Sequence, residues 1–198
     1  MLHKLFPTIV MQDSLKDDIL QHEKEYLKTF NSMIKSYGNY ISEEKYVLNS
    51  ENLISLKSKI QSKLNEYLHT IYKPSTEVEI YITQSWITAT GAGGWHHQHK
   101  HPNSFLSGVL YLNVTKEDEI SFYSDSYQQI LLNSKVYDEY NSTEWTLNID
   151  NFDILLFPSS LSHSVEKTNG DSMRVSLAFN SFLKGKLGEE KNACGLIL

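Results

Sequence analysis

The chain changes from a helical to a strand-like pattern after Pro74, and this change limits its fold more than any other feature. Val78, Ile80 and Ile82 alternate with other residues, which is the period of a β-strand. Turns rich in Asn, Ser and Asp separate most of the later strand-like segments, which lie at 105–113, 120–123, 145–149, 153–157 and 173–182. Many short strands without intervening helices predict an antiparallel sandwich or barrel.

The first 75 residues are expected to form a scaffold around this β region. They begin with a predicted strand, Leu5–Val10. A helix capped by Asp13 or Ser14 should follow and stop at Gly38. Its apolar positions are Leu15, Ile19, Tyr26, Phe30, Met33 and Ile34.

A second helix is predicted from about Ser50 to Leu68, and Lys73-Pro74 closes the helical region. Its buried face should consist of Leu53, Leu56, Ile60, Leu64, Tyr67 and Leu68. Neither an internal repeat nor a flexible linker is evident. We therefore expect residues 1–198 to form one domain, in which residues 1–75 supply the strand and helices and residues 76–183 form the β core.

Composition and charge exclude several classes of protein. The 198 residues are 40% hydrophobic, as in a globular protein, and the net charge of −6 gives no broad positive surface for DNA or RNA. No apolar run approaches the length of a membrane span, and the N-terminus does not read as a signal peptide. Cys194 is the only cysteine, which indicates a reducing compartment. We expect a cytoplasmic protein; its oligomeric state is not readable from the sequence.

Four of the eight histidines lie within six residues: His96, His97, His99 and His101. Neutral imidazole is the commonest protein metal ligand, and two histidines two residues apart on a strand share a face. His99 and His101 come just before an apolar strand, at the turn that Pro102 marks, where a barrel can hold a metal and admit substrate. The alternative is a surface tract that binds metal only adventitiously. His96 and His97 are interpreted as neighbours of the site.

Two further segments supply polar residues that suit the same site. His163 follows the apolar segment 153–157 in a polar loop. Arg174 and Ser176 share one face of the last strand. An arginine in an apolar strand is costly unless it meets an anion, and its planar fork suits a carboxylate. A structural pair with Asp or Glu is the alternative for Arg174.

Taken in order, these motifs resemble the 2-oxoglutarate-dependent, iron(II) oxygenase superfamily. The chain shows His-x-His, then Ser-Gly-Val-x-Tyr-Leu, then Leu-Phe-Pro-Ser-x-Leu-x-His-x-Val, then Arg-x-Ser-x-x-Phe-Asn. More narrowly, it is similar to a small family of uncharacterised 2OG-Fe(II) oxygenases from phages and bacteria. The resemblance covers about residues 76–183, and Leu5-Phe6-Pro7 matches the usual opening of that family.

The resemblance implies a mainly β fold, a double-stranded β-helix (jelly-roll, cupin-like), with N-terminal helices at its flank. It implies that His99, His101 and His163 bind the metal and that Arg174 and Ser176 bind the distal carboxylate of 2-oxoglutarate. Tyr111 falls where a tyrosine of prolyl-hydroxylase-like members holds the same carboxylate; the alternative is a plain core aromatic.

The implied activity is that of a dioxygenase using Fe(II), 2-oxoglutarate and O2. It hydroxylates an unidentified protein side chain or small molecule and releases succinate and CO2. Trp86, Trp95 and the loop Gly91–Gly94 are expected near the mouth of the site.

One residue departs from the superfamily pattern. The usual triad has two histidines and one carboxylate, whereas His101 stands at the carboxylate position. Imidazole also suits Zn, Ni and Cu, so the identity of the metal stays open, and His97-x-His99 is an alternative pair. Two other functions remain: a cupin-like three-histidine dioxygenase that does not use 2-oxoglutarate, and a non-catalytic phage β-sandwich protein.

Overall fold

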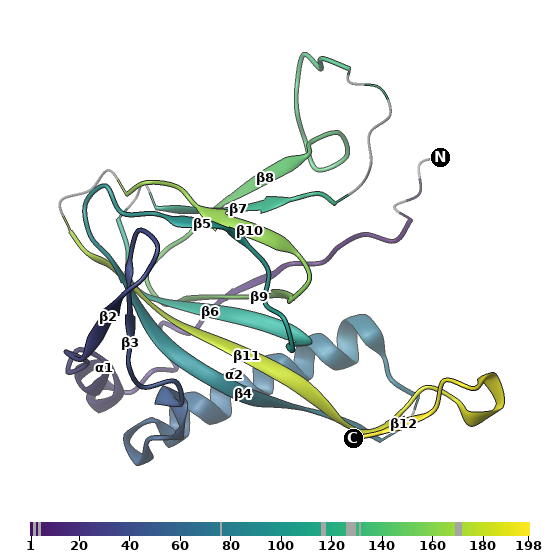
Figure 1. The fold of residues 1–198 in the computed structure, drawn as a ribbon, viewed down its shortest axis with the longest axis horizontal. Coiled ribbons are helices and arrows are strands. Elements are labelled where there is room, and N and C mark those ends of the chain that lie inside the picture. Colours follow the sequence, from purple (N-terminus) through teal and green to yellow (C-terminus); the bar gives the residue numbers. More distant parts are fainter. Residues whose placement is uncertain are drawn as a thin grey trace.

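The protein is built from two antiparallel β-sheets that face each other, with a helix along the outer side of the larger sheet (Figure 1). The computed structural model describes residues 1, 3, 5–75, 77–115, 118–125, 130, 132–168 and 172–198. Strands distant in sequence are neighbours in both sheets. This is the jelly-roll arrangement that the resemblance implied.

The larger sheet carries eight strands. In spatial order they are β1 (Met11–Ser14), β9 (Asp153–Pro158), β6 (Leu106–Asn113), β11 (Arg174–Leu187), β4 (Val78–Thr90), β3 (Tyr40–Ser42) and β2 (Met33–Lys35), and β12 (Leu196–Ile197) pairs with β11. The smaller sheet has the order β5 (His96–His99), β10 (Ser162–Val165), β7 (Glu119–Tyr123) and β8 (Glu144–Asn148).

The main helix, α2 (Ile54–Tyr67), packs on the larger sheet as expected. Single-turn 3-10 segments at Val47–Asn49 and Glu51–Leu53 precede it, and a π-helical turn, Leu68–Tyr72, follows it. All six residues of its predicted apolar face are buried. Lys73 adopts a left-handed conformation before Pro74 and ends the helical region. None of the described helices has the length and apolar character needed to cross a bilayer.

The core has two layers, and strand alternation assigns residues to each. The layer under α2 includes Leu177 and Phe179 of β11. The layer between the sheets consists of Tyr111, Ile120, Phe122, Ile149, Leu155 and Phe157. Because successive side chains of a strand point to opposite faces, Arg174 and Ser176 face the space between the sheets.

Two N-terminal predictions were wrong. The strand expected at Leu5–Val10 begins instead at Met11, where the backbone pairs with β9. Within the expected helix from Asp13 to Gly38, only Gln21–Leu27 is helical (α1). Residues 33–35 form β2, and Gly38, at φ 80°, lies in the β2–β3 hairpin. This hairpin adds to the edge of β4, and the backbone pairing gained there cannot be seen in local apolar spacing.

Candidate metal centre

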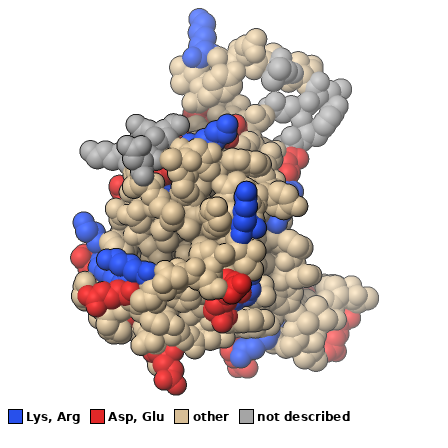
Figure 2. Space-filling view, turned by 60° about the vertical axis from the view of Figure 1, so that its left-hand side comes forward, with Lys and Arg blue, Asp and Glu red and all other residues tan. Residues whose placement is uncertain are grey.

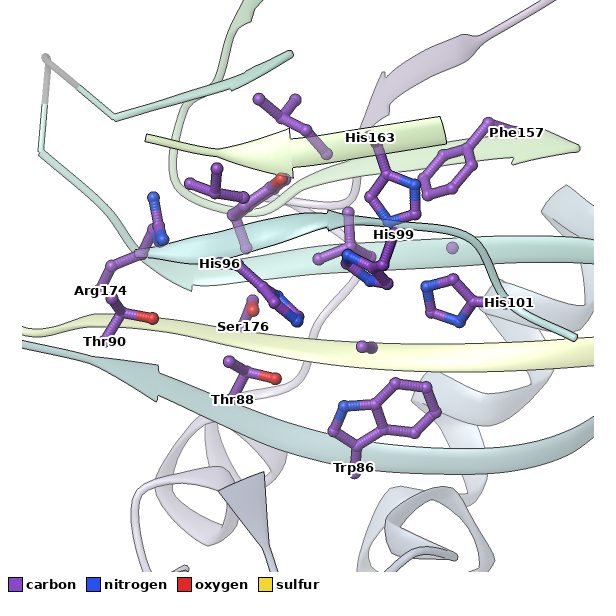
Figure 3. Close-up of a pocket in the computed structure, with 16 residues that line it drawn as sticks. Trp86, Thr88, Thr90, His96, His99, His101, Phe157, His163, Arg174 and Ser176 are labelled. Carbon is purple, nitrogen blue, oxygen red and sulfur yellow. The ribbon is translucent and has the colours of Figure 1, made fainter. Parts of the chain in front are cut away.

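Three histidines converge between the two sheets. His99 ends β5 and His163 lies in β10, where the two residues are directly paired across the strands. His101 follows two residues after β5. One ring nitrogen from each of these histidines lies within 4.8 Å of the others. His163 therefore belongs to a strand and not to the loop expected from the sequence, and the strand pairing is what brings it to His99 (Figure 3).

The hydrogen bonds of the three rings determine which nitrogen is available. In each ring, Nδ1 lies at hydrogen-bond distance from an oxygen: His97 O at 2.7 Å for His99, Leu161 O at 3.0 Å for His163, and Asn180 Oδ1 at 2.8 Å for His101. A carbonyl oxygen only accepts, so each Nδ1 donates. Each ring therefore keeps an unprotonated Nε2, the form that binds a metal.

The environment keeps all three imidazoles neutral. Burial lowers the pKa of His163 to about 3 and that of His101 to about 4, and His99 lowers both further. Burial also lowers the pKa of His99. At neutral pH protons therefore do not compete with a metal cation for these imidazoles. The donor set thus fits a transition metal, and among the described residues no carboxylate joins this group.

A cavity extends from the histidines to the start of β11. Its polar lining includes Arg174, Ser176 and Tyr111, together with Thr88 and Thr90 of β4. Sheet register explains their proximity: Ser176 is paired with Tyr111 on one side and with Thr88 on the other, and Arg174 is paired with Thr90. Tyr111 is 2% exposed, and burial raises the pKa of its hydroxyl, which therefore stays protonated.

Arg174 also has a carboxylate partner within the protein. Its Nη1 donates to Asp118 Oδ1 at 3.4 Å, and both side chains are buried. Burial lowers the pKa of Arg174, while Tyr111 and Asp118 act in the opposite direction. Among the described residues this long contact occupies one of the five N–H donors of the guanidinium. The structural pairing considered from the sequence is thus present, and Arg174 still lines the cavity.

Of the other residues expected near the site, some line the cavity and others do not. His96, interpreted as a neighbour, lines the cavity and stacks on His99 with ring centroids 4.2 Å apart. Trp86 lines it as expected, whereas Trp95 and the loop Gly91–Gly94 are not among the described residues that do.

Sequence reasoning missed Thr88, Thr90 and Asp118, and it assigned no role to Asn180, the last residue of the fourth motif. The alternation of β4 around Trp86 could have identified the two threonines. Asp118 and Asn180 meet their partners only through the fold.

The sequence of the β core matches a known family. Residues 84–180 match the family model described as "Putative 2OG-Fe(II) oxygenase". This range includes all three converging histidines, Arg174, Ser176 and Tyr111. No curated protein sequence matches the chain.

Solved structures with the same fold include three relevant relatives. A 2OG-Fe(II) oxygenase family oxidoreductase from Burkholderia pseudomallei has a TM-score of 0.60 at 10% identity, covering 87% of this chain and 83% of that one. The non-heme alpha-ketoglutarate-dependent epimerase SnoN from nogalamycin biosynthesis has 0.62 at 13% identity, covering 88% and 78%. A Pseudomonas putida prolyl-4-hydroxylase has 0.59 at 11% identity, covering 87% and 92%.

The structural likeness establishes the shared fold, and the family match covers the residues that converge in the cavity. The β core, matched over residues 84–180, is therefore that of a 2OG-Fe(II) oxygenase, an enzyme that uses iron(II), 2-oxoglutarate and O2.

Proposed function

We propose that His99, His101 and His163 bind iron(II) through Nε2, and that Arg174, Ser176 and Tyr111 bind the distal carboxylate of 2-oxoglutarate. The observation that carries this proposal is the convergence of the three histidines, each with Nδ1 held by an oxygen acceptor. Three neutral ligands leave the charge of a divalent cation uncompensated. A dianionic cosubstrate beside it therefore supplies charge that the protein does not.

The remaining roles follow from the chemistry of the cavity. When bound, iron, 2-oxoglutarate and O2 supply the oxidation, which yields succinate, CO2 and a hydroxylated product. The Arg174 fork suits a carboxylate, and the hydroxyls of Ser176 and Tyr111 are further donors. Val109, Ile120 and Phe157 line the apolar side of the same cavity, where they exclude water and strengthen these polar contacts.

The two alternative functions make different demands on the polar end of the cavity. A cupin-like dioxygenase that does not use 2-oxoglutarate requires no carboxylate-binding group, and the role of Arg174 would then be its ion pair with Asp118. A non-catalytic sandwich protein requires neither the group nor the convergent histidines. The placement of Arg174, Ser176 and Tyr111 in one cavity with the histidines supports the oxygenase.

The setting of the enzyme is also part of the proposal. The packing of α2 against the larger sheet supports one oxygenase domain over residues 1–198. Acidic and basic side chains are intermixed on the face drawn in Figure 2, which favours a protein side chain or a small molecule over duplex nucleic acid as substrate. The single cysteine and the resemblance to phage and bacterial proteins support a cytoplasmic enzyme of such an origin.

The proposal can be tested without knowing the primary substrate. Protein loaded anaerobically with iron(II) should retain stoichiometric metal and, on exposure to O2 and 2-oxoglutarate, should form succinate slowly. His163→Ala should lose the metal. His97→Ala should keep it, because His99 is held by the backbone oxygen of residue 97 and not by its ring. Stoichiometric iron without succinate would favour the cupin-like alternative. No retained metal would contradict the proposed centre.

A further inference from the structure

Among the three proposed ligands, His101 is the one whose ring is held by another side chain. His99 and His163 donate to backbone carbonyls, which any residue provides. His101 donates instead to Oδ1 of Asn180, at 2.8 Å. The orientation of this ring therefore depends on the identity of a single residue in β11.

A chain of three serines, two of them buried, fixes the Asn180 amide in turn. Asn180 is paired across the sheet with Ser107, whose hydroxyl donates to Asn180 Oδ1 at 3.0 Å. Ser107 Oγ lies 2.8 Å from Ser159 Oγ, and Ser159 Oγ lies 2.7 Å from Ser104 Oγ. Ser107 and Ser159 are each 1% exposed. In this arrangement Asn180 Oδ1 lies within hydrogen-bond distance of both the Ser107 hydroxyl and His101 Nδ1.

The amide has a direct effect on the ligand nitrogen. An acceptor at Nδ1 keeps the proton on that atom, so the lone pair of Nε2 stays available, and it makes the ring a stronger base. His101 occupies the position at which the superfamily has a carboxylate, so its properties as a ligand decide how far imidazole replaces that group.

We propose that Asn180, held by Ser107, Ser159 and Ser104, is a positioning residue that fixes the tautomer and orientation of His101 and thereby the affinity of the centre for metal. This inference rests on the proposed function, because it requires that His101 be a ligand. It concerns how the protein sets the tautomer and orientation of the His101 ring, and not the oxidation reaction.

Three variants separate positioning from general structural support. Asn180→Leu removes the acceptor at similar size. Asn180→Asp keeps the acceptor and adds negative charge beside the centre. Ser181→Ala is the matched control, because the Ser181 hydroxyl is fully buried on the same strand but bonds to Leu106 O at 2.7 Å and not to the Asn180 chain.

Two measurements are needed, and neither depends on turnover. The affinity for cobalt(II), a spectroscopic probe of the site, is measured anaerobically against a competing chelator. The tautomer of each histidine is read from long-range proton–nitrogen NMR spectra of the metal-free protein. Asn180→Leu should weaken cobalt binding by about 10- to 100-fold. In the same variant the His101 ring should populate both neutral tautomers, while His99 and His163 keep the wild-type tautomer. Asn180→Asp should bind cobalt at least as tightly as wild type, and Ser181→Ala should match wild type in both measurements.

The inference is overturned if folded Asn180→Leu keeps wild-type affinity and the wild-type His101 tautomer, or if Ser181→Ala weakens metal binding equally. If Asn180→Leu does not fold, Asn180→Asp decides, and weakened binding in that variant overturns the inference. Failure of the proposed function gives a different result: wild type itself would then bind no stoichiometric cobalt. In that case an unchanged His101 tautomer in the variants would still refute the positioning role.

Discussion

At the scale of single residues, each histidine of the centre uses one ring nitrogen for the protein and leaves the other for a metal. Nδ1 donates to an oxygen in all three cases, and burial keeps the rings neutral. Arg174 likewise contacts Asp118 and lines the cavity. Substitutions at single residues should therefore affect metal binding and cosubstrate binding separately.

Arg174→Lys should weaken 2-oxoglutarate binding without loss of metal. Lysine keeps the positive charge opposite Asp118 but lacks the planar fork that matches a carboxylate. Loss of one or two charge-assisted hydrogen bonds corresponds to about 10- to 100-fold in affinity. Calorimetric titration of the metal-loaded protein measures this change. Unchanged affinity would assign Arg174 to the structural pair with Asp118 alone.

His96→Ala should leave the metal content unchanged and tighten 2-oxoglutarate binding. Figure 3 draws the His96 ring between His99 and the side of the cavity formed by Arg174 and Ser176, which is the space that the cosubstrate would occupy. The ring must turn aside on binding, and alanine removes this requirement. The same titration provides the measurement, with His97→Ala as control. Weaker binding in His96→Ala would show that the ring contacts the cosubstrate instead.

At the scale of elements, β11 organises the molecule because its two faces serve different layers. Its inner face presents Arg174, Ser176 and Asn180, while Leu177 and Phe179 pack under α2. A shift of register by one residue would exchange these faces. Packing beneath α2 therefore helps to keep the polar residues in place.

Gly108→Ala tests this packing. A Cβ at Gly108 would lie 2.2 Å from the Phe179 ring and 2.7 Å from Leu156, and both side chains are fully buried. The overpacking should cost about 1–3 kcal/mol in the free energy of unfolding, measured by urea denaturation. Gly91→Ala is the control, because a Cβ there meets nothing within 4 Å. Equal stability of the two variants would contradict this account of the sheet–helix layer.

The contact between β1 and α2 predicts a pH dependence of stability. The hydrogen bond from Lys63 lowers the pKa of Asp13 below its usual 3.8. Because the folded-state pKa lies below the unfolded one, the contribution is present at neutral pH and is lost as the pH falls through the folded-state value. Asp13→Asn should therefore reduce stability at pH 7, by at most about 1 kcal/mol since the pair is partly exposed. The difference from wild type should shrink as the pH falls below 3.8 and should vanish below the folded-state pKa of Asp13. A difference that grew with acidity would be contrary to this expectation.

At the scale of the whole molecule, the sequence predicted what depends on local pattern and on motifs. Alternation placed Arg174 and Ser176 on one face and Tyr111 on the inner side of β6, and helical spacing predicted the buried face of α2. The resemblance to 2OG-Fe(II) oxygenases implied the jelly-roll fold. Long-range partners were not predictable: Met33–Ser42 became a hairpin because the edge of β4 offered backbone pairing. Asp118 and Asn180 reach their partners only through the fold.

The central claim is that one cavity holds both a three-histidine iron centre and a 2-oxoglutarate site. The most direct measurement is anaerobic iron analysis combined with a 2-oxoglutarate titration of wild type, His101→Ala and Arg174→Ala. We predict stoichiometric iron and saturable cosubstrate binding in wild type, loss of iron in His101→Ala, and retained iron with lost cosubstrate binding in Arg174→Ala. Iron retained in His101→Ala, or 2-oxoglutarate binding unaffected in Arg174→Ala, would contradict it.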